Sequence, residues 1–233
     1  RALNDAGVTA TGGEIVGLIG PNGAGKTTLV NVLTGIVPQT GGAFGVAGAD
    51  LSTAPSHMIA RSGLVRTFQN LRLFSALTVR ENVEVSALAS GDEQAVDGDR
   101  PSPSVDELLA AAGLWDVRDR RAGELDYGTS RRLELARAAA AKPSFLLLDE
   151  PTSGMSDAES AAMIDQVKTM AAIAGAGVLV IDHDLNFITG ICDRIYCLDR
   201  GVVIAEGTPA EIQADPAVQA AYLGAPSDSA PSP

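Results

Sequence analysis

Eight residues near the start of the chain, GPNGAGKT at 20–27, have the types and the spacing needed to hold a phosphate group. They match the pattern G-x-x-x-x-G-K-[ST] and lie between an apolar, β-branched run at 14–20 and a predicted helix at 26–35. The glycines allow a tight turn whose backbone N–H groups point inward, and the helix adds the positive end of its dipole. A glycine-rich turn without a ligand is the alternative, and the strand–loop–helix context argues against it.

The side chains of this loop suit a nucleoside triphosphate with a bound metal ion. Lys26 is expected to contact the β- and γ-phosphates, and the hydroxyl of Thr27 to hold Mg²⁺. The candidate phosphate-binding residues are Pro21, Asn22, Gly23, Ala24, Gly25, Lys26, Thr27 and Thr28.

Two acids end an apolar run far along the chain, FLLLDE at 145–150. Mg²⁺ prefers hard oxygen ligands and keeps several waters, so Asp149 suits the metal. Glu150 suits a general base that polarises a water molecule. Two acids at the surface end of a strand could be ordinary on their own, but the phosphate loop in the same chain favours a hydrolytic site.

The elements that must position these residues are mainly strands at the two ends of the chain. Continuous apolar runs at 145–150 and 177–182 are typical of parallel strands buried on both faces. We also predict a strand at 64–68, hairpin strands within 38–51 and a terminal hairpin at 196–207. Together these segments predict an α/β core with a mostly parallel sheet.

Helices are predicted for 56–63 and for the whole middle of the chain, 78–142, so a helical segment interrupts the core. Ser/Thr-x-x-Glu capping boxes mark several helix starts. The boxes pair Thr78 with Glu81, Ser104 with Glu107, Ser156 with Glu159, and Thr208 with Glu211. The polar stretch at 90–104 is expected to be a mobile loop, and 225–233 a disordered tail.

The charge and the apolar content of the chain exclude some classes of protein. Seventeen Lys and Arg against 29 Asp and Glu give a net charge of −12, which is the wrong sign for binding nucleic-acid phosphates. No apolar run approaches the roughly 20 residues that span a bilayer, and no signal-peptide pattern opens the chain, so a cytoplasmic protein is expected. We interpret Cys192 and Cys197 as small buried hydrophobic residues and His57 as a surface residue without a role.

Taken in order, GPNGAGKTT, TFQ, LDYGTSRRLELARA, FLLLDEPTSGM and IDHD resemble the motifs of the ATPase subunits of ABC transporters. The resemblance covers nearly the whole chain. It implies a P-loop NTPase core of the ABC type with a mostly parallel sheet, an antiparallel β subdomain and an inserted helical subdomain, with ATP and Mg²⁺ as cofactors. One ABC ATPase domain over 1–233 would then divide into core and β subdomain at 1–69 and 143–224, a helical subdomain at 70–142, and the tail.

The resemblance also implies roles for matched residues. Gln69 would touch Mg²⁺ and the attacking water, Asp149 would serve the metal, and His183 would contact the γ-phosphate beside Glu150. Ser153 would belong to a loop that crosses a dimer interface. In this family, the signature turn of one subunit closes over the γ-phosphate that the phosphate loop of the other subunit holds. The signature-turn candidates here are Leu125, Asp126, Gly128 and Thr129.

The signature turn departs from the family pattern. Asp126 replaces the usual serine, Tyr127 the first of two glycines, and Thr129 the usual glutamine. A carboxylate that faced ATP would cost on the order of 1 to 4 kcal/mol in repulsion. We therefore expect Asp126 to turn away, toward a backbone N–H or toward Arg131 or Arg132, and to leave Gly128 and the N–H groups near Thr129 and Ser130 for the anion.

Three segments look most like the importers of branched-chain amino acids, a group that includes relatives moving urea and short amides. They are RTFQNLRLFSALTVRENV, the Tyr-Gly-x-x-Arg-Arg-Leu-Glu form of the signature, and AEGTPAEIQADPAVQAAYLG. This similarity implies a homodimer, or a heterodimer with a related ATPase, on the cytoplasmic face of the inner membrane. Its partners would be permease subunits and, indirectly, an extracytoplasmic solute-binding protein. Leu71, Leu73 and Phe74 would line the groove for the permease, with core packing as the alternative.

Two other functions remain open at this point. One is the motor of a lipid or lipopolysaccharide exporter, and another is a soluble ABC ATPase that works on ribosomes or DNA. Relatives also carry an aromatic residue upstream of the first strand to stack on adenine, whereas the first aromatic here is Phe44. Because 1–14 resembles the second strand of the family, we expect either that the N-terminal strand is missing or that the ATPase follows a permease in one polypeptide.

Overall fold

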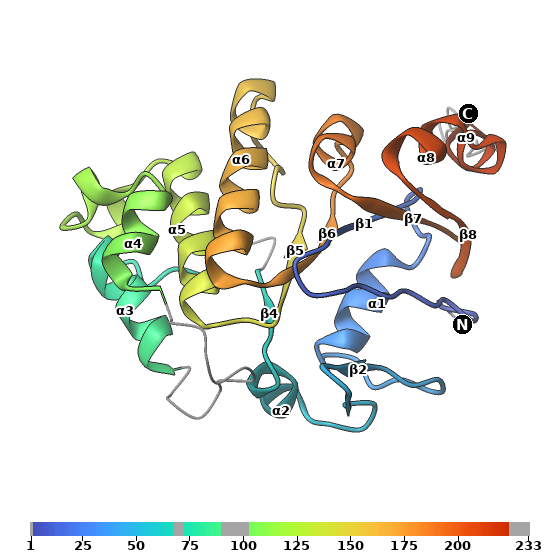
Figure 1. Ribbon diagram of the computed structural model, residues 1–233, viewed down its shortest axis with the longest axis horizontal. Helices are drawn as coiled ribbons and strands as arrows, with labels where there is room; N and C mark the ends of the chain where they lie inside the picture. The colour runs from blue at the N-terminus through green and yellow to red at the C-terminus, as the bar shows by residue number, and fades with distance from the viewer. Residues whose placement is uncertain (1, 68–71, 90–102, 224–233) are drawn as a thin grey trace, which may run out of the picture.

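A six-stranded sheet forms the centre of the computed structural model, which describes residues 2–67, 72–89 and 103–223. The strand order is β4-β5-β6-β1-β7-β8. Figure 1 shows the sheet crossing the molecule, with α6 and α7 on one side and α1 on the other. Gln69, Leu71, most of the predicted loop at 90–104 and the predicted tail lie outside the described residues.

The centre of the sheet is parallel and buried on both faces. β1 (Ile15–Ile19) pairs with β6 (Gly177–Ile181), and β6 pairs with β5 (Phe145–Asp149). Val16 packs toward α1 while its neighbour Ile15 packs toward the helices of the other layer, since they belong to separate core clusters. Successive side chains of a strand point to opposite faces, so both need apolar surroundings. This double burial explains why the apolar runs are continuous.

The remaining strands fall where the patterns predicted them. β4 (Leu64–Arg66) runs parallel to β5, and β7 (Arg194–Asp199) runs parallel to β1. β8 (Val202–Gly207) returns antiparallel to β7 and closes the predicted terminal hairpin. The predicted hairpin within 38–51 is a separate antiparallel pair. Its strands are β2 (Gly45–Val46) and β3 (Ala49–Asp50).

The four helices that were predicted from capping boxes begin at the expected residues. All four boxes form, because each Ser or Thr accepts from the backbone N–H of its Glu while that Glu accepts in return. The helices are α1 (Lys26–Leu33), α2 (Ser56–Arg61), α3 (Val79–Ala89), α4 (Val105–Ala111), α5 (Tyr127–Ala140), α6 (Asp157–Ala174), α7 (Leu185–Ile191), α8 (Pro209–Ala214) and α9 (Pro216–Leu223). Two 3-10 turns lie at Trp115–Val117 and Ala122–Glu124.

A helical block interrupts the sheet. Helices α3, α4 and α5 pack against one another beside β4 and β5, two strands that are neighbours although the whole block lies between them in sequence (Figure 1). Leu108, Leu109 and Leu133 are fully buried among these helices. The predicted interruption of the core is therefore confirmed within the described residues.

The N-terminal segment differs from expectation, because residues 2–13 contain no strand. The segment crosses the surface with Asp5 in the left-handed region (φ 62°) and a turn at Gly12 and Gly13. Its links to the core are scattered: the N–H of Asn4 donates to the carbonyl of Gly201 at 2.8 Å, and the N–H of Thr9 donates to the hydroxyl of Tyr196 at 3.3 Å. Ala6, Val8 and Ala10 alternate along the segment and pack against the core, but among the described residues no strand pairs with it, so no ladder of hydrogen bonds forms here.

Both cysteines are buried, as predicted. Burial raises the pKa of the Cys192 thiol to about 12 and that of Cys197 to about 11, so neither forms a thiolate near neutral pH. None of the helices in the described ranges combines the length and the apolar content that crossing a membrane requires.

Candidate functional site

The phosphate loop connects β1 to α1 and presents an open helix end. Gly25, the N-cap residue of α1, adopts φ 109° and has no side chain to cap the helix. The first N–H groups of α1 therefore stay available for an anion. Gly20 is also required by packing, since a Cβ on it would lie 2.0 Å from the carbonyl oxygen of Leu198. The strand–loop–helix geometry predicted from the motif is confirmed.

Lys26 folds back over this loop. Its Nζ donates to the carbonyl of Gly20 at 2.6 Å and to that of Pro21 at 3.1 Å. Burial lowers the pKa of Lys26, and the nearby carboxylate of Glu150 acts in the opposite direction. Two candidates that are far apart in sequence, Lys26 and Glu150, are thus brought into one electrostatic environment.

Glu150 occupies a strained backbone position directly after β5. Its φ is 49°, a left-handed conformation that costs a non-glycine residue about 1 to 2 kcal/mol. The N–H of Glu150 donates to the carbonyl of Ile181 at 2.7 Å, which ties the residue to the end of β6. Strain at this position supports a functional role for the carboxylate, because a glycine would be the unstrained choice.

Asp149, the last residue of β5, forms a buried ion pair. An Arg66 guanidinium nitrogen lies 2.6 Å from an Asp149 carboxylate oxygen, and only 10% and 11% of the two side chains are exposed. Arg66 also donates to the side-chain oxygen of Asn31 on α1, at 2.8 Å. This link between β4, β5 and α1 was missed by sequence reasoning, which quoted Arg66 only as the first residue of an importer-like segment and gave it no role.

The candidate metal ligands fit an ion that arrives with the nucleotide. Among the described residues, no group of three or more His, Cys, Asp or Glu side chains could hold a metal by itself. Thr27 offers one hydroxyl, and Asp149 offers one carboxylate that Arg66 already engages. Mg²⁺ usually takes one or two protein oxygens and completes its shell with waters and phosphates, so this sparse set suits it. Gln69 lies outside the described residues.

His183 projects from the end of β6, at the edge of the sheet where Glu150 follows β5. Its side chain is 71% exposed, and its Nδ1 lies 3.5 Å from an oxygen of Asp182. The other carboxylate oxygen of Asp182 accepts from the hydroxyl of Thr152 at 2.7 Å and from its N–H at 3.0 Å. The buried Asp182 therefore fastens the loop after β6 to the loop after β5. His57 is exposed on α2, as predicted.

Asp126 caps α5. One of its carboxylate oxygens accepts from the N–H of Thr129 at 2.8 Å, and the other accepts from the Thr129 hydroxyl at 2.9 Å. These hydrogen bonds lower the pKa of Asp126, so it stays ionised. The expectation that Asp126 turns toward a backbone N–H is confirmed.

The expectation that the N–H groups of Thr129 and Ser130 remain for an anion is wrong. The N–H of Thr129 bonds to the Asp126 side chain, and the N–H of Ser130 bonds to the Asp126 carbonyl at 2.9 Å. An aspartate at the N-cap satisfies the third N–H of a helix by its nature. In the part of the chain that the structure describes, the N–H groups of Tyr127 and Gly128 make no hydrogen bond. They are the donors that remain for a ligand.

Tyr127 joins this turn to the loop after β5. Its hydroxyl donates to the carbonyl of Ser153 at 2.7 Å and accepts from two Arg131 nitrogens at 2.8 and 3.1 Å. Arg131 is nearly buried and also pairs with Glu134 at 3.0 Å. Sequence reasoning treated Tyr127 as a replaced glycine and as part of the importer form of the signature, and it missed these contacts. The four-residue spacing to Arg131 on one helix was a usable signal.

A sheet edge that carries acids beside an open helix end defines the class of the protein, a P-loop nucleoside triphosphatase. The family model described as "ABC transporter" matches residues 3–153, and a second, described as "Branched-chain amino acid ATP-binding cassette transporter", matches residues 202–228. The chain therefore belongs to the ABC transporter family, as an ATP-binding cassette.

Named relatives agree with this membership. The chain is 39% identical to the high-affinity branched-chain amino acid transport ATP-binding protein LivG of Salmonella typhimurium, covering 96% of this chain and 92% of the relative. It is 38% identical to the lipopolysaccharide export system ATP-binding protein LptB of Escherichia coli, covering 96% and 91%.

Solved cassettes share the fold. The ADP conformation of MJ1267, an ATP-binding cassette of an ABC transporter, aligns with a TM-score of 0.81 at 28% identity over 96% of this chain and 92% of that one. The dimeric post-hydrolysis state of the cassette MJ0796 with ADP and Pi aligns at 0.73 and 26% identity over 89% and 90%.

Replacing Asp126 tests whether this acid obstructs the turn. We expect Asp126→Ser to change the rate of ATP hydrolysis by less than tenfold, because the carboxylate is already bonded to Thr129 and serine also caps helices. Steady-state phosphate release measures this. A rise of tenfold or more would show that the carboxylate repels ATP. Asp126→Ala is the control for capping, with an expected loss of about 1 kcal/mol of stability.

Proposed function

We propose that this chain is the ATP-hydrolysing subunit of an importer that moves branched-chain amino acids or related small polar solutes through a membrane permease. The catalytic motifs are shared by every ABC ATPase, so they cannot support this choice. The observation that carries the proposal is the match of the C-terminal segment 202–228 to the branched-chain amino acid family, together with the LivG similarity.

ATP would lie on the phosphate loop, with its β- and γ-phosphates against the N-terminus of α1. Lys26 would exchange the carbonyls of Gly20 and Pro21 for phosphate oxygens. Thr27 and Asp149, together with Gln69, would hold Mg²⁺, whose charge would neutralise the triphosphate. The ion pair with Arg66 fixes the side chain of Asp149 at the end of β5, which supports this role.

Hydrolysis would proceed by in-line attack of a water on the γ-phosphate. Glu150 would accept the proton of that water, and His183 would hold the phosphate from the neighbouring strand end. The support for these roles is their placement at the same sheet edge, the strained backbone of Glu150, and the Thr152–Asp182 link between their loops.

A second molecule would complete the site. Figure 1 shows α6 and β5 between α5 and α1, so the turn at the start of α5, with Leu125, Asp126, Gly128 and Thr129, is separated from the phosphate loop of its own chain. In a dimer like that of MJ0796, a partner's turn would supply its N–H groups to the phosphate. The Tyr127–Ser153 bond would carry movement of this turn to the interface loop.

The permease would contact the region that follows Gln69, with Leu71, Leu73 and Phe74 lining the groove. Phe74 is 47% exposed, and the guanidinium of Arg137 lies 4.9 Å from the centre of its ring. Leu73 packs against the core, which favours the packing alternative for that residue. Leu71 lies outside the described residues. Membrane attachment would then be peripheral, through the permease.

An exporter motor is the second candidate, because LptB is nearly as similar as LivG. Co-purifying the complex and measuring its ATPase in proteoliposomes separates the two. We expect a several-fold stimulation by a branched-chain amino acid, urea or a short amide together with its binding protein. Stimulation by lipopolysaccharide, and by none of these solutes, would favour the exporter.

A further inference from the structure

The last helix of the chain touches the start of the phosphate loop. The backbone N–H of Gly20 donates to the hydroxyl of Tyr222 on α9 at 2.9 Å. Tyr222 is 38% exposed, and burial raises the pKa of its hydroxyl, so the group stays protonated near neutral pH. A residue of the C-terminal segment therefore satisfies the first amide of the phosphate loop.

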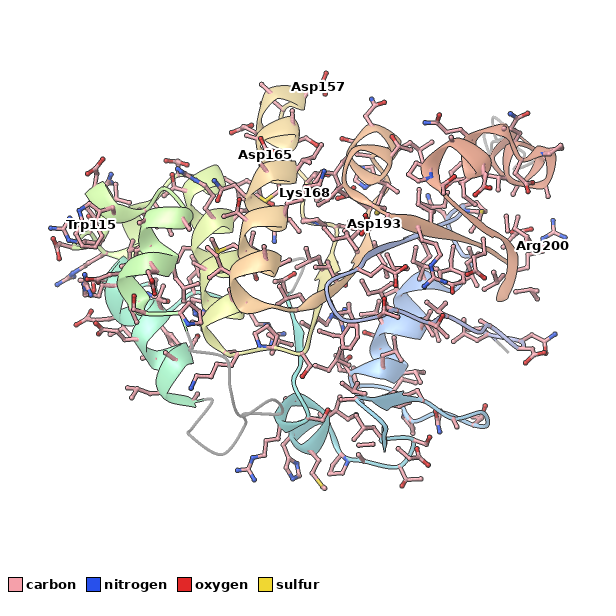
Figure 2. All side chains as sticks on the ribbon, in the orientation of Figure 1. Trp115, Asp157, Asp165, Lys168, Asp193 and Arg200 are labelled. Atoms are coloured by element: carbon pink, nitrogen blue, oxygen red, sulfur yellow. The ribbon has the colours of Figure 1, made fainter. Side chains whose placement is uncertain are left out.

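The turn that follows β7 also contacts the phosphate loop, at Ala24. The N–H of Gly201, in the turn between β7 and β8, donates to the carbonyl of Ala24 at 2.8 Å. Figure 2 shows Arg200 of this turn pointing outward, and 92% of its side chain is exposed. The turn thus presents its backbone to the loop. Two contacts from the C-terminal part of the chain therefore hold the phosphate loop, one at its first residue, Gly20, and one at Ala24.

Gly20 is held on two sides. Tyr222 binds its N–H, and Lys26 binds its carbonyl at 2.6 Å. When Lys26 turns to the phosphates, its bond to Gly20 is lost while the Tyr222 bond can persist. The hydroxyl would then keep the beginning of the loop in place as the nucleotide enters. A loop that is already fixed binds its ligand with less loss of conformational freedom.

We propose that Tyr222 is a positioning residue for the phosphate loop, and that through its hydroxyl α9 sets the affinity of the cassette for nucleotide. This inference rests on the nucleotide site of the proposed function and adds a residue that no motif contains. Loss of one neutral hydrogen bond is expected to weaken binding by roughly two- to tenfold.

Tyr222→Phe in the full chain tests the proposal, because it keeps the ring and removes the hydroxyl. We expect amide exchange of Gly20, followed by NMR, to accelerate, and the affinity for ATP and ADP, measured by calorimetry in EDTA, to fall roughly two- to tenfold. A purely structural role for α9 would leave the affinity unchanged, since the packing of the ring is retained, and faster exchange at Gly20 would then report only the lost hydrogen bond.

Tyr196→Phe is the matched control. It removes a tyrosine hydroxyl that bonds to Arg194 at 2.6 Å and to the Thr9 hydroxyl at 3.1 Å, away from the loop. Its nucleotide affinity should equal that of the wild type. Wild-type affinity in Tyr222→Phe, with or without faster exchange at Gly20, would overturn the positioning role. Failure of the wild type itself to bind ATP would overturn the proposed nucleotide site as well.

Discussion

Glu150→Gln is expected to lower the rate of ATP hydrolysis by roughly 10²- to 10⁴-fold, the range typical of losing a general base. Glutamine has the shape of glutamate but cannot accept the proton of the attacking water. ATP binding should persist, because Lys26 and the open end of α1 are unchanged. Phosphate release measures the rate, and size-exclusion chromatography with ATP should show a long-lived dimer.

The matched control for this prediction is Glu84→Gln on α3. Glu84 is partly exposed and lies 3.7 Å from Arg80, an exposed pair of small expected effect. Its hydrolysis rate should stay within twofold of the wild type. Normal turnover in Glu150→Gln would remove Glu150 from its proposed role.

Most of the fold could be predicted because local signals agreed with the tertiary structure. The apolar runs of β5 and β6 are continuous because both faces are buried, and the capping boxes form where Ser or Thr precedes Glu by three residues. The strand order could not be predicted, since pairing of β4 with β5 spans the helical block. Residues 2–13 were misjudged because a family likeness cannot show whether a neighbouring strand pairs with the segment, and among the described residues none does.

The candidate site, like the fold, could be predicted only in part. The phosphate loop and the acids after β5 were predictable, because each is a contiguous motif with its own chemistry. The Arg66–Asp149 pair and the Tyr222–Gly20 bond join residues 83 and 202 positions apart, and no spacing rule reaches that far. The orientation of Asp126 followed from electrostatics. The N–H groups left for an anion did not follow, because the Thr129 N–H that Asp126 caps cannot also bind a ligand.

Lys26→Met should weaken ATP binding and leave the stability of the nucleotide-free protein nearly unchanged. A charged hydrogen bond is worth about 1.5 to 3 kcal/mol, so its loss should weaken ATP binding by roughly 10- to 150-fold. The nucleotide-free protein should unfold within about 4 °C of the wild type, because methionine fills similar space and removes a partly desolvated charge. Thermal unfolding with and without ATP measures both, and the ATP-induced rise in Tm should be largely lost.

Because the pKa of Lys26 is lowered in the folded protein, the contribution of Lys26 to the free energy of unfolding depends on pH. Burial lowers the pKa of Lys26 below the 10.5 of an unperturbed lysine, so the unfolded chain binds this proton more tightly than the native protein does. Wild-type stability relative to Lys26→Met should therefore rise as the pH climbs from the lowered pKa toward 10.5.

Lys168→Met is the matched control for ATP binding. It loses a lysine on α6 that bonds to the Gly190 carbonyl at 3.0 Å, and it should keep the full ATP-induced rise in Tm (Figure 2). Tight ATP binding by Lys26→Met would show that the ammonium remains on the loop carbonyls rather than moving to phosphate.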